Sequence, residues 1–265
     1  MKREIAILGI VIALGLGLLF GWFIPSPFAA PEGVSLRDQI ISRGELIVGT
    51  SADYPPFENF TYPYTGEIEG FDVDLAQLIA DELGVTLTMT HLDFGSLISA
   101  CSAGTIDMIA AAMTYNEERA KSLAASVTYI TVSQVIVVKE ASPLTTITNL
   151  TYFEDKPIDI GVQTGTVMHD ELLALDNVTI TASPNAVTVM TNLISDVVDC
   201  VYIDEPIFTA YNQTENLRII YSTGSEPFAL WTRYGEPELL YTMNDVILNA
   251  YLDGTVYDLF DKWFG

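Results

Sequence analysis

The chain has 265 residues, of which 49% are hydrophobic and 17% are charged. Its 35 acidic side chains outnumber its 11 basic ones, so the formal net charge at pH 7 is −24. This length and apolar content suit one large or two small domains with a proper core, and they exclude a disordered chain. Nucleic acid is excluded as a partner, because its phosphates would be repelled by so acidic a chain.

Residues 1–33 are predicted to be a signal peptide or a transmembrane anchor with a linker. Lys2 and Arg3 precede an apolar stretch at 5–24, close to the ~20 residues that a membrane-spanning helix needs. A usual signal core is only roughly 7–15 residues long, so we favour an uncleaved anchor over a cleaved signal. By the positive-inside rule, the rest of the chain then lies outside the cytoplasm.

Beyond residue 44, strand and helix patterns alternate, which predicts parallel sheets covered by helices. Asp72 or Asp74 is predicted to cap the first helix and Gly84 to end it. The expected strands are 46–48, 85–89, 108–113, 132–138, 158–162, 178–182, 200–203, 217–221 and 228–231. The expected helices are 72–83, 96–104, 167–175, 185–194, 237–252, one from 206 onward and a last turn or two before the C-terminus.

Two such series predict an α/β fold of two lobes joined by two hinge crossings. Residues 34–138 and 226–265 are expected to form lobe 1, and residues 139–225 an inserted lobe 2. The hinges are expected near 138–141 and 221–226. Open α/β sheets bind ligands at the carboxyl ends of their strands, so we expect a cleft between the lobes.

The segment 107–119 combines a buried strand, a polar turn and a basic residue. Asn116 is predicted to begin a helix, and Arg119 can grip both oxygens of a carboxylate while Thr114 and nearby amides add donors. The alternative is that Arg119 pairs with an acidic neighbour on the surface.

Cysteine and histidine offer little further chemistry. Cys101 and Cys200 fit either a structural disulfide or two buried thiols, and we favour the thiols. His91 and His169 show no metal-ligand spacing, so no metal site and no cofactor are expected.

Several motifs follow one another in a characteristic order: Gly-Thr-Ser-Ala-Asp-Tyr-Pro-Pro-Phe-Glu at 49–58, Gly-Phe-Asp-Val-Asp-Leu at 70–75 and Gly-Thr-Ile-Asp-Met at 104–108. Met113-Thr114 with Glu118-Arg119, Gly-Val-Gln-Thr-Gly-Thr at 161–166, and Asp-Gly-Thr at 253–255 with Lys-Trp-Phe-Gly at 262–265 continue the series. The region 44–265 thereby resembles the extracytoplasmic solute-binding proteins, family 3, of ABC importers for polar amino acids. These have the type II periplasmic binding protein fold.

The resemblance implies a ligand site. The α-carboxylate of an amino acid would be held by Arg119 and Thr114, with backbone amides near Ala112 and Thr166. The α-ammonium would be held by Asp204, for which a helix cap before Pro206 is the alternative role.

The resemblance also implies which residues contact the side chain of the ligand. Tyr54 and Phe94 would enclose it, although each could be ordinary packing. Ser51 stands where many members have aspartate or asparagine, which disfavours a cationic ligand. Gln163 can donate and accept, which suits a neutral polar or amide side chain, or it is a solvated turn residue.

These features favour a monomeric, non-enzymatic binding module that delivers a free amino acid to an ABC permease in the membrane. A ligand bridging Arg119 and Asp204 would close the lobes. One alternative is a dehydratase acting on a cyclic carboxylic acid, for which only carboxylates such as Glu58 or Glu205 are available as general acid or base. Another is a membrane-tethered amino-acid sensor.

Overall fold

The computed structural model describes residues 33–61 and 66–265. The chain divides into Met1–Ser35 and Leu36–Gly265, and the second unit contains all the sheets. Apart from Gly33, the predicted signal or anchor lies outside the described residues. Within the described ranges, no helix has both the length and the hydrophobicity needed to cross a bilayer.

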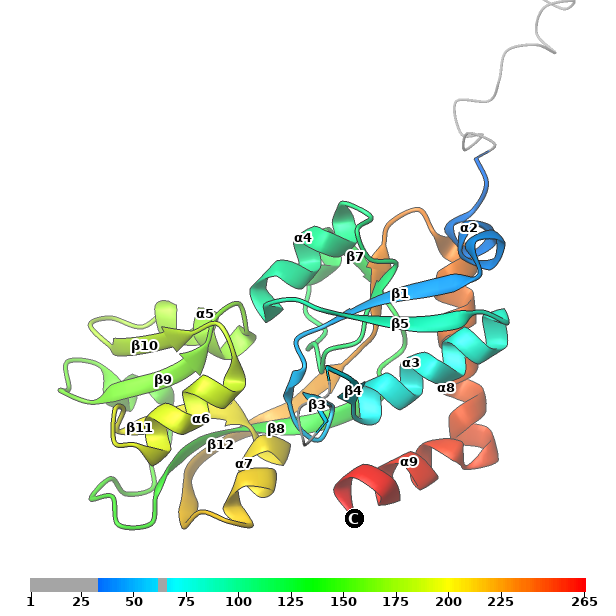
Figure 1. Cartoon of the computed structure of the whole chain (residues 1–265). Helices are drawn as coiled ribbons and strands as arrows, with labels where there is room; N and C mark the ends of the chain where they lie inside the picture. The colour runs from blue at the N-terminus through cyan, green and yellow to red at the C-terminus, as the bar shows by residue number, and fades with distance from the viewer. Residues whose placement is uncertain (1–32, 62–65) are drawn as a thin grey trace, which may run out of the picture. The chain divides into compact units, whose positions relative to one another are not determined.

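The first lobe is built on a five-stranded sheet of order β5-β1-β6-β13-β7 (Figure 1). β1 is parallel to β5 and β6, whereas β13 is antiparallel to β6 and β7. The strands are β1 (Glu45–Thr50), β5 (Thr86–His91), β6 (Met108–Ile109), β7 (Leu123–Ala125) and β13 (Trp231–Arg233). The helices of this lobe are α2 (Leu36–Arg43), α3 (Phe71–Leu83), α4 (Leu97–Ser102), α8 (Pro237–Asp253) and α9 (Thr255–Phe264), with 3-10 turns η1 (Phe94–Ser96) and η2 (Arg119–Lys121).

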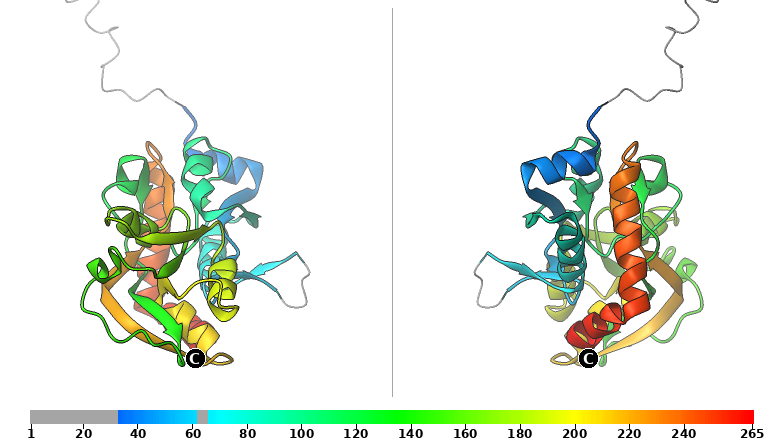
Figure 2. Two further views of the ribbon diagram at one scale, coloured as in Figure 1. Left: turned by 90° about the vertical axis from the view of Figure 1, so that its left-hand side faces the viewer. Right: turned by 90° about the vertical axis from the view of Figure 1, so that its right-hand side faces the viewer.

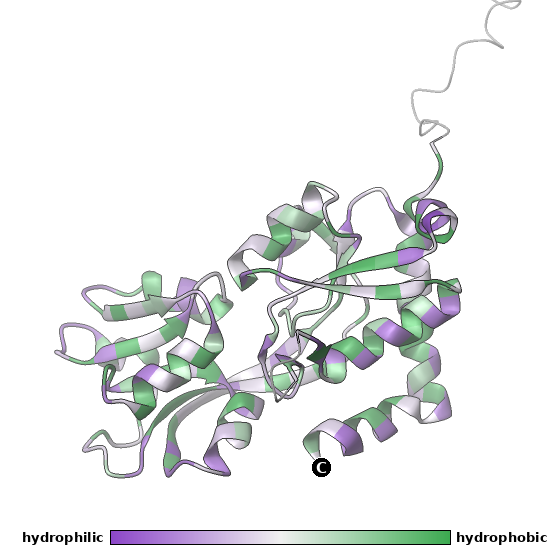
Figure 3. Ribbon diagram, in the orientation of Figure 1, coloured by the Kyte–Doolittle hydropathy of each residue, from purple (hydrophilic) through white to green (hydrophobic). Residues whose placement is uncertain are grey.

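Alternation along β1 explains why helices cover both faces of this sheet. Leu46 and Val48 pack in the cluster that includes α3 and α8, whereas Ile47 packs with the cluster of α4. Gly49 also faces this side: a Cβ there would lie 2.3 Å from Ile106 Cδ1 and 3.1 Å from Leu97 Cδ2 of α4, so a glycine lets these side chains pack closely against β1. Figure 3 shows β1 as mostly hydrophobic, as a strand buried on both faces requires.

The second lobe is built on a five-stranded sheet of order β10-β9-β11-β8-β12. β9 is parallel to β10 and β11, and β8 is antiparallel to both β11 and β12. The strands are β8 (Ile130–Lys139), β9 (Asp159–Gln163), β10 (Thr179–Ser183), β11 (Cys200–Asp204) and β12 (Leu217–Phe228). The helices are α5 (Val167–Leu173), α6 (Ala186–Ile194) and α7 (Glu205–Asn212), with the 3-10 turn η3 (Leu150–Phe153).

The second sheet extends beyond the expected inserted segment 139–225 on both sides. β8, which the sequence analysis assigned to lobe 1, pairs with β11 and β12 over nearly its whole length. The long antiparallel partner β12 makes β8 part of this sheet, and such a pairing leaves no local mark in the sequence. We therefore place the two crossings between the sheets at 126–129 and 229–230.

A small antiparallel sheet fills the aromatic loop after β1. It consists of β2 (Asp53–Tyr54), β3 (Glu58–Phe60) and β4 (Ile68–Glu69), in the order β2-β3-β4. β3 and β4 project from lobe 1, while β2 lies next to lobe 2 and contacts α6 (Figure 2).

Three local predictions need correction. The strand expected at 108–113 ends after Ile109, and the helix expected from Asn116 is only the η2 turn, where the Asn116 side chain accepts the Arg119 N–H. Neither Asp72 nor Asp74 caps α3: its N-cap is Gly70, without a side-chain hydrogen bond. Cys101 and Cys200, in contrast, are two free buried thiols, as favoured.

Candidate functional site

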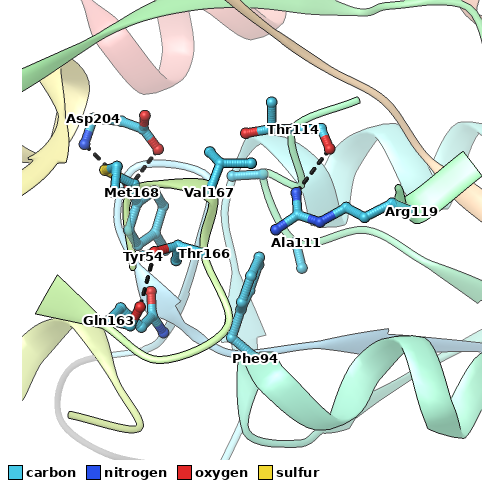
Figure 4. Close-up of a pocket in the computed structure, with 11 residues that line it drawn as sticks. Tyr54, Phe94, Ala111, Thr114, Arg119, Gln163, Thr166, Val167, Met168 and Asp204 are labelled. Carbon is cyan, nitrogen blue, oxygen red and sulfur yellow. Dashed lines mark hydrogen bonds between the residues drawn. The ribbon is translucent and has the colours of Figure 1, made fainter. Parts of the chain in front are cut away.

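A cavity lies between the two sheets, at the ends of the strands and the turns that follow them (Figure 4). Eight of the nine predicted site residues line it, and Ser51 does not. The lining residues are Tyr54, Phe94, Ala111, Ala112, Thr114 and Arg119 from lobe 1, and Gln163, Thr166, Val167, Met168 and Asp204 from lobe 2.

Arg119 is a buried cation that bridges the lobes. Its Nη1 donates to the carbonyl oxygen of Thr114 at 2.7 Å, and its Nη2 donates to that of Gly165, across the cavity, at 3.1 Å. The guanidinium carbon lies 5.5 Å from the centre of the Phe94 ring. Desolvation lowers the pKa of Arg119 to about 10, so the side chain is still charged at neutral pH.

In the described part of the chain, no carboxylate lies within ion-pair distance of this charge, although Asp170, Asp204 and Glu226 act on it from farther away. Arg119 is only 7% exposed, and among residues 33–61 and 66–265 it forms no ion pair. The surface ion pair considered as an alternative is therefore not formed. A buried cation without a directly paired carboxylate is a favourable place for a ligand anion.

Asp204 provides the opposite charge at the carboxyl end of β11. The Tyr54 hydroxyl donates to its Oδ2 at 2.6 Å, while Oδ1 is buried without a hydrogen-bond partner in the described part of the chain. Asp204 precedes α7 but makes no capping hydrogen bond with its side chain, so the alternative role as a cap is absent. Desolvation raises its pKa to about 7.

The other predicted polar site groups, those of Thr166, Ala112 and Ser51, already have hydrogen-bond partners within the protein. Thr166 caps α5: its hydroxyl accepts from His169 N at 3.2 Å and donates to the Gln163 carbonyl oxygen at 2.8 Å. The backbone N–H of Ala112, expected as a donor to the ligand, already donates to Asp72 Oδ2 at 2.7 Å. Ser51 lies outside the lining because its hydroxyl donates to Glu58 Oε1, at 3.2 Å, in the interior of lobe 1.

Asp72 was missed by sequence reasoning as a residue that supports the cavity. Its Oδ2 also accepts from the Tyr129 hydroxyl at 2.8 Å, and desolvation raises its pKa to about 7. It holds Ala112 in a left-handed conformation with φ of 45°, which is unfavourable for alanine. The Gly-Phe-Asp motif marks this residue, but nothing in the sequence shows which backbone group it binds.

Asp53, a second missed residue, does not line the cavity but contacts Gln163, which does. Its Oδ2 accepts from Gln163 Nε2 at 3.1 Å and from the backbone N–H of Ala186 at 2.8 Å, both in lobe 2. Gln163 is 4% exposed, so it is not the solvated turn residue that the sequence left as an alternative. Ala111, Val167 and Met168 complete the lining. The glycine turn before α5 is the only sequence signal for the last two.

The cavity thus places a buried cation on one lobe opposite a buried carboxylate on the other, with Tyr54 and Phe94 beside them (Figure 4). Such a pair complements a small molecule that carries both an anionic and a cationic group. Fold and site together define a two-lobed solute-binding protein with the type II periplasmic binding protein fold.

Comparison with known proteins identifies the family. Residues 46–265 match the bacterial extracellular solute-binding proteins, family 3, and the chain belongs to this family.

Individual relatives are similar over different extents. The chain is 36% identical to the arginine-binding extracellular protein ArtP of Bacillus subtilis (strain 168) over 129 residues, covering 49% of this chain and 48% of ArtP. It is 26% identical to the L-cystine-binding protein TcyJ of Escherichia coli (strain K12), with 89% and 88% covered. The solved structure of AncCDT-1, an ancestral amino acid-binding protein described as a precursor of cyclohexadienyl dehydratase, superposes with a TM-score of 0.81. It is 31% identical, with 87% and 100% covered.

Proposed function

We propose that this protein captures a free amino acid in the cavity between its lobes and delivers it to an ABC importer. The observation that carries the proposal is the pair Arg119 and Asp204: both are buried, and neither forms an ion pair among the residues that the structure describes. An amino acid brings the two missing charges at once, as its α-carboxylate and its α-ammonium.

The ligand lies with its carboxylate at Arg119 and Thr114 and its ammonium at Asp204 Oδ1. Its side chain then points along Tyr54 and Phe94 towards Gln163. Because the two charged partners belong to different lobes, the ligand binds the closed arrangement more tightly than any open one and shifts the population towards it.

We favour a polar amino acid as cargo, with a neutral polar side chain first, because Gln163 offers hydrogen bonds at the far end. ArtP and TcyJ are named for arginine and cystine, which are also polar. Family membership supports the delivery step and a location outside the cytoplasm. Anchoring by residues 1–33 stays a prediction from the sequence.

We do not propose an enzyme. A dehydratase needs an acid or base at the substrate, and the two carboxylates considered for this role, Glu58 and Glu205, do not line the cavity. Asp204 does line it, and we assign it to the α-ammonium of the ligand. Glu58 is fully buried in lobe 1, next to Ser51.

Thermal unfolding of the full chain in the presence of each of the twenty amino acids tests the proposal. The protein is first unfolded and refolded to remove any co-purified ligand. A ligand that binds only the folded state adds about 2.7 kcal/mol of stability at 100 times its dissociation constant. We expect one or a few amino acids to raise the melting temperature of the wild type.

Two arginine variants locate the effect. In Arg119→Ala we expect the ligand-induced shift to disappear, because the α-carboxylate loses its charge partner. Arg218→Ala is the matched control, since Arg218 also donates to backbone carbonyls, those of Glu140, Ser142 and Leu144, but away from the cavity. A well-folded wild type that responds to no amino acid would refute the proposal.

A further inference from the structure

Asp53 lies in lobe 1, but its carboxylate accepts hydrogen bonds from lobe 2. It belongs to β2, is 6% exposed, and accepts from Gln163 on β9 and from Ala186 at the start of α6. The neighbouring Tyr54 also crosses the cavity, to Asp204. Two consecutive residues of β2 therefore contact the ends of two different lobe 2 strands, and the role of Asp53 is not explained by the charge pair that holds the amino-acid backbone.

The bond to α6 fixes where the Asp53 carboxylate sits. Asn185 caps this helix by accepting the N–H of Thr188 at 2.8 Å, which leaves the N–H of Ala186 without a partner from its own helix. Asp53 Oδ2 supplies that partner from the opposite lobe at 2.8 Å. The N-terminus of a helix favours a negative charge, so the carboxylate is held by both a hydrogen bond and the helix dipole.

The carboxylate in turn determines which end of the Gln163 amide faces the cavity. Gln163 Nε2 lies 3.1 Å from Asp53 Oδ2 and 3.4 Å from the carbonyl oxygen of Pro184. Both neighbours are acceptors, so the NH₂ group must point at them and the carbonyl Oε1 must point elsewhere. In the described part of the chain, the side-chain hydrogen bonds of Gln163 are all made by Nε2, and Gln163 lines the cavity.

We propose that Asp53 is a specificity-determining positioning residue: it orients the Gln163 amide so that the side-chain end of the cavity accepts hydrogen bonds. This end then selects amino acids whose side chain donates an N–H, namely an amide, a guanidinium or an ammonium, over those with a carboxylate. A ligand carboxylate would meet an acceptor oxygen, with the Asp53 carboxylate behind it, and would leave Gln163 Oε1 unpaired. The inference rests on the proposed binding of an amino acid.

The test measures dissociation constants by titration calorimetry on the full chain, for glutamine, asparagine, arginine and lysine against glutamate and aspartate. The readout is the ratio between the tightest acidic ligand and the tightest donor ligand. For the wild type we expect a preference for the donor ligand of at least about 10-fold, the discrimination that one well-placed hydrogen bond of about 1.4 kcal/mol provides.

Two substitutions of Asp53 distinguish orientation of the Gln163 amide from a role that only supports the closed form. In Asp53→Ala the Gln163 amide can rotate and present its NH₂ group, so we expect the preference to fall to within about 3-fold of unity. Asp53→Asn keeps an oxygen that can accept from both Ala186 and Gln163, so we expect it to retain most of the preference. Asp199→Ala is the control: it removes the same charge from a carboxylate that accepts a backbone N–H, that of Asp159, within lobe 2.

Each other outcome is decisive. If Asp53→Ala weakens all ligands equally and leaves the ratio unchanged, Asp53 only supports the closed form and the inference is overturned. If Asp53→Asn loses the preference as fully as Asp53→Ala, charge rather than orientation sets it, which also overturns the inference. A wild type that prefers an acidic or an apolar amino acid overturns the inference but not the proposed function, whereas a wild type that binds no amino acid overturns both.

Discussion

At the scale of single residues, the cavity depends on two buried charged side chains, Arg119 and Asp204, which form no ion pair in the described part of the chain. Asp204 is surrounded by Tyr54, Glu226 and Arg119, and desolvation raises its pKa to about 7 despite the hydrogen bond from Tyr54. Its carboxyl group is therefore partly protonated at neutral pH. The ammonium of an amino acid requires the ionised form, so binding and deprotonation of Asp204 are linked.

This linkage predicts a pH dependence of affinity. Below pH 7 the ligand must displace a proton from Asp204, so we expect the affinity to fall about 30-fold between pH 8 and pH 5.5. The stability of the ligand-free protein should move in the opposite direction: a carboxyl with a raised folded-state pKa is least costly to bury when protonated, so unfolding becomes harder as the pH falls from 7 towards 4. Calorimetric titration across this range tests the first effect. In Asp204→Asn, binding should be weak and independent of pH, and a flat wild-type profile would contradict the assignment.

At the scale of elements, the conformation of the turn after β6 is determined by a side chain of another element, Asp72 of α3. Residues 110–113 are buried but form no strand, because the Asp72 carboxylate accepts the backbone N–H of Ala112. This hydrogen bond holds Ala112 at a φ of 45°. The apolar pattern of 108–113 correctly indicated burial. It could not show that a carboxylate from another element replaces the hydrogen bonds of a strand.

The strain at Ala112 predicts that the same substitution has different effects on stability at positions 111 and 112. Ala112→Gly removes a left-handed alanine, which costs about 1–2 kcal/mol, and this offsets the greater flexibility of unfolded glycine. Ala111→Gly has no such strain to remove and should destabilise by about 0.5–1 kcal/mol. We expect Ala112→Gly to exceed Ala111→Gly in free energy of unfolding by at least ~1 kcal/mol, measured by chemical denaturation. Equal values would show that Ala112 is not strained.

At the scale of the whole molecule, acidity dominates the surface. The net charge is −24, and the ion pairs formed in the described part of the chain involve only a few of the 35 acidic side chains. Self-repulsion at this charge destabilises any compact state, and salt screens it, because the Debye length shrinks from about 10 Å at 0.1 M to about 3 Å at 1 M.

We therefore expect the melting temperature of the full chain at pH 7.5 to rise by several degrees between 0.05 and 1 M NaCl. The control is the same salt series at a pH near the sequence pI of about 4.1, where little net charge is left to screen and the gain should be small. Calorimetric melting curves measure both series. A gain of the same size at both pH values would mean that salt acts through hydrophobic burial rather than charge.

The order and type of the main elements could be predicted because they depend on local patterns. The apolar spacing of α3, the proline at the start of α8 and the glycine turns at strand ends are all visible in a short stretch of sequence. Short motifs likewise led to the family and to Arg119, Thr114 and Asp204 as lining residues. The sequence by itself thus determined the class of fold and the charged pair of the cavity.

Only the tertiary structure decided what depends on partners far apart in the chain. β8 belongs to the second sheet because β12, more than seventy residues later, pairs with it. The Asp72 carboxylate does not cap α3 but accepts the backbone N–H of Ala112. The Asp53 carboxylate accepts hydrogen bonds from Gln163 and Ala186 in the opposite lobe. In all three cases, the three-dimensional arrangement of whole elements decides which partner is within reach. A polar side chain can bind almost any donor in reach, so the local sequence cannot specify which one it meets.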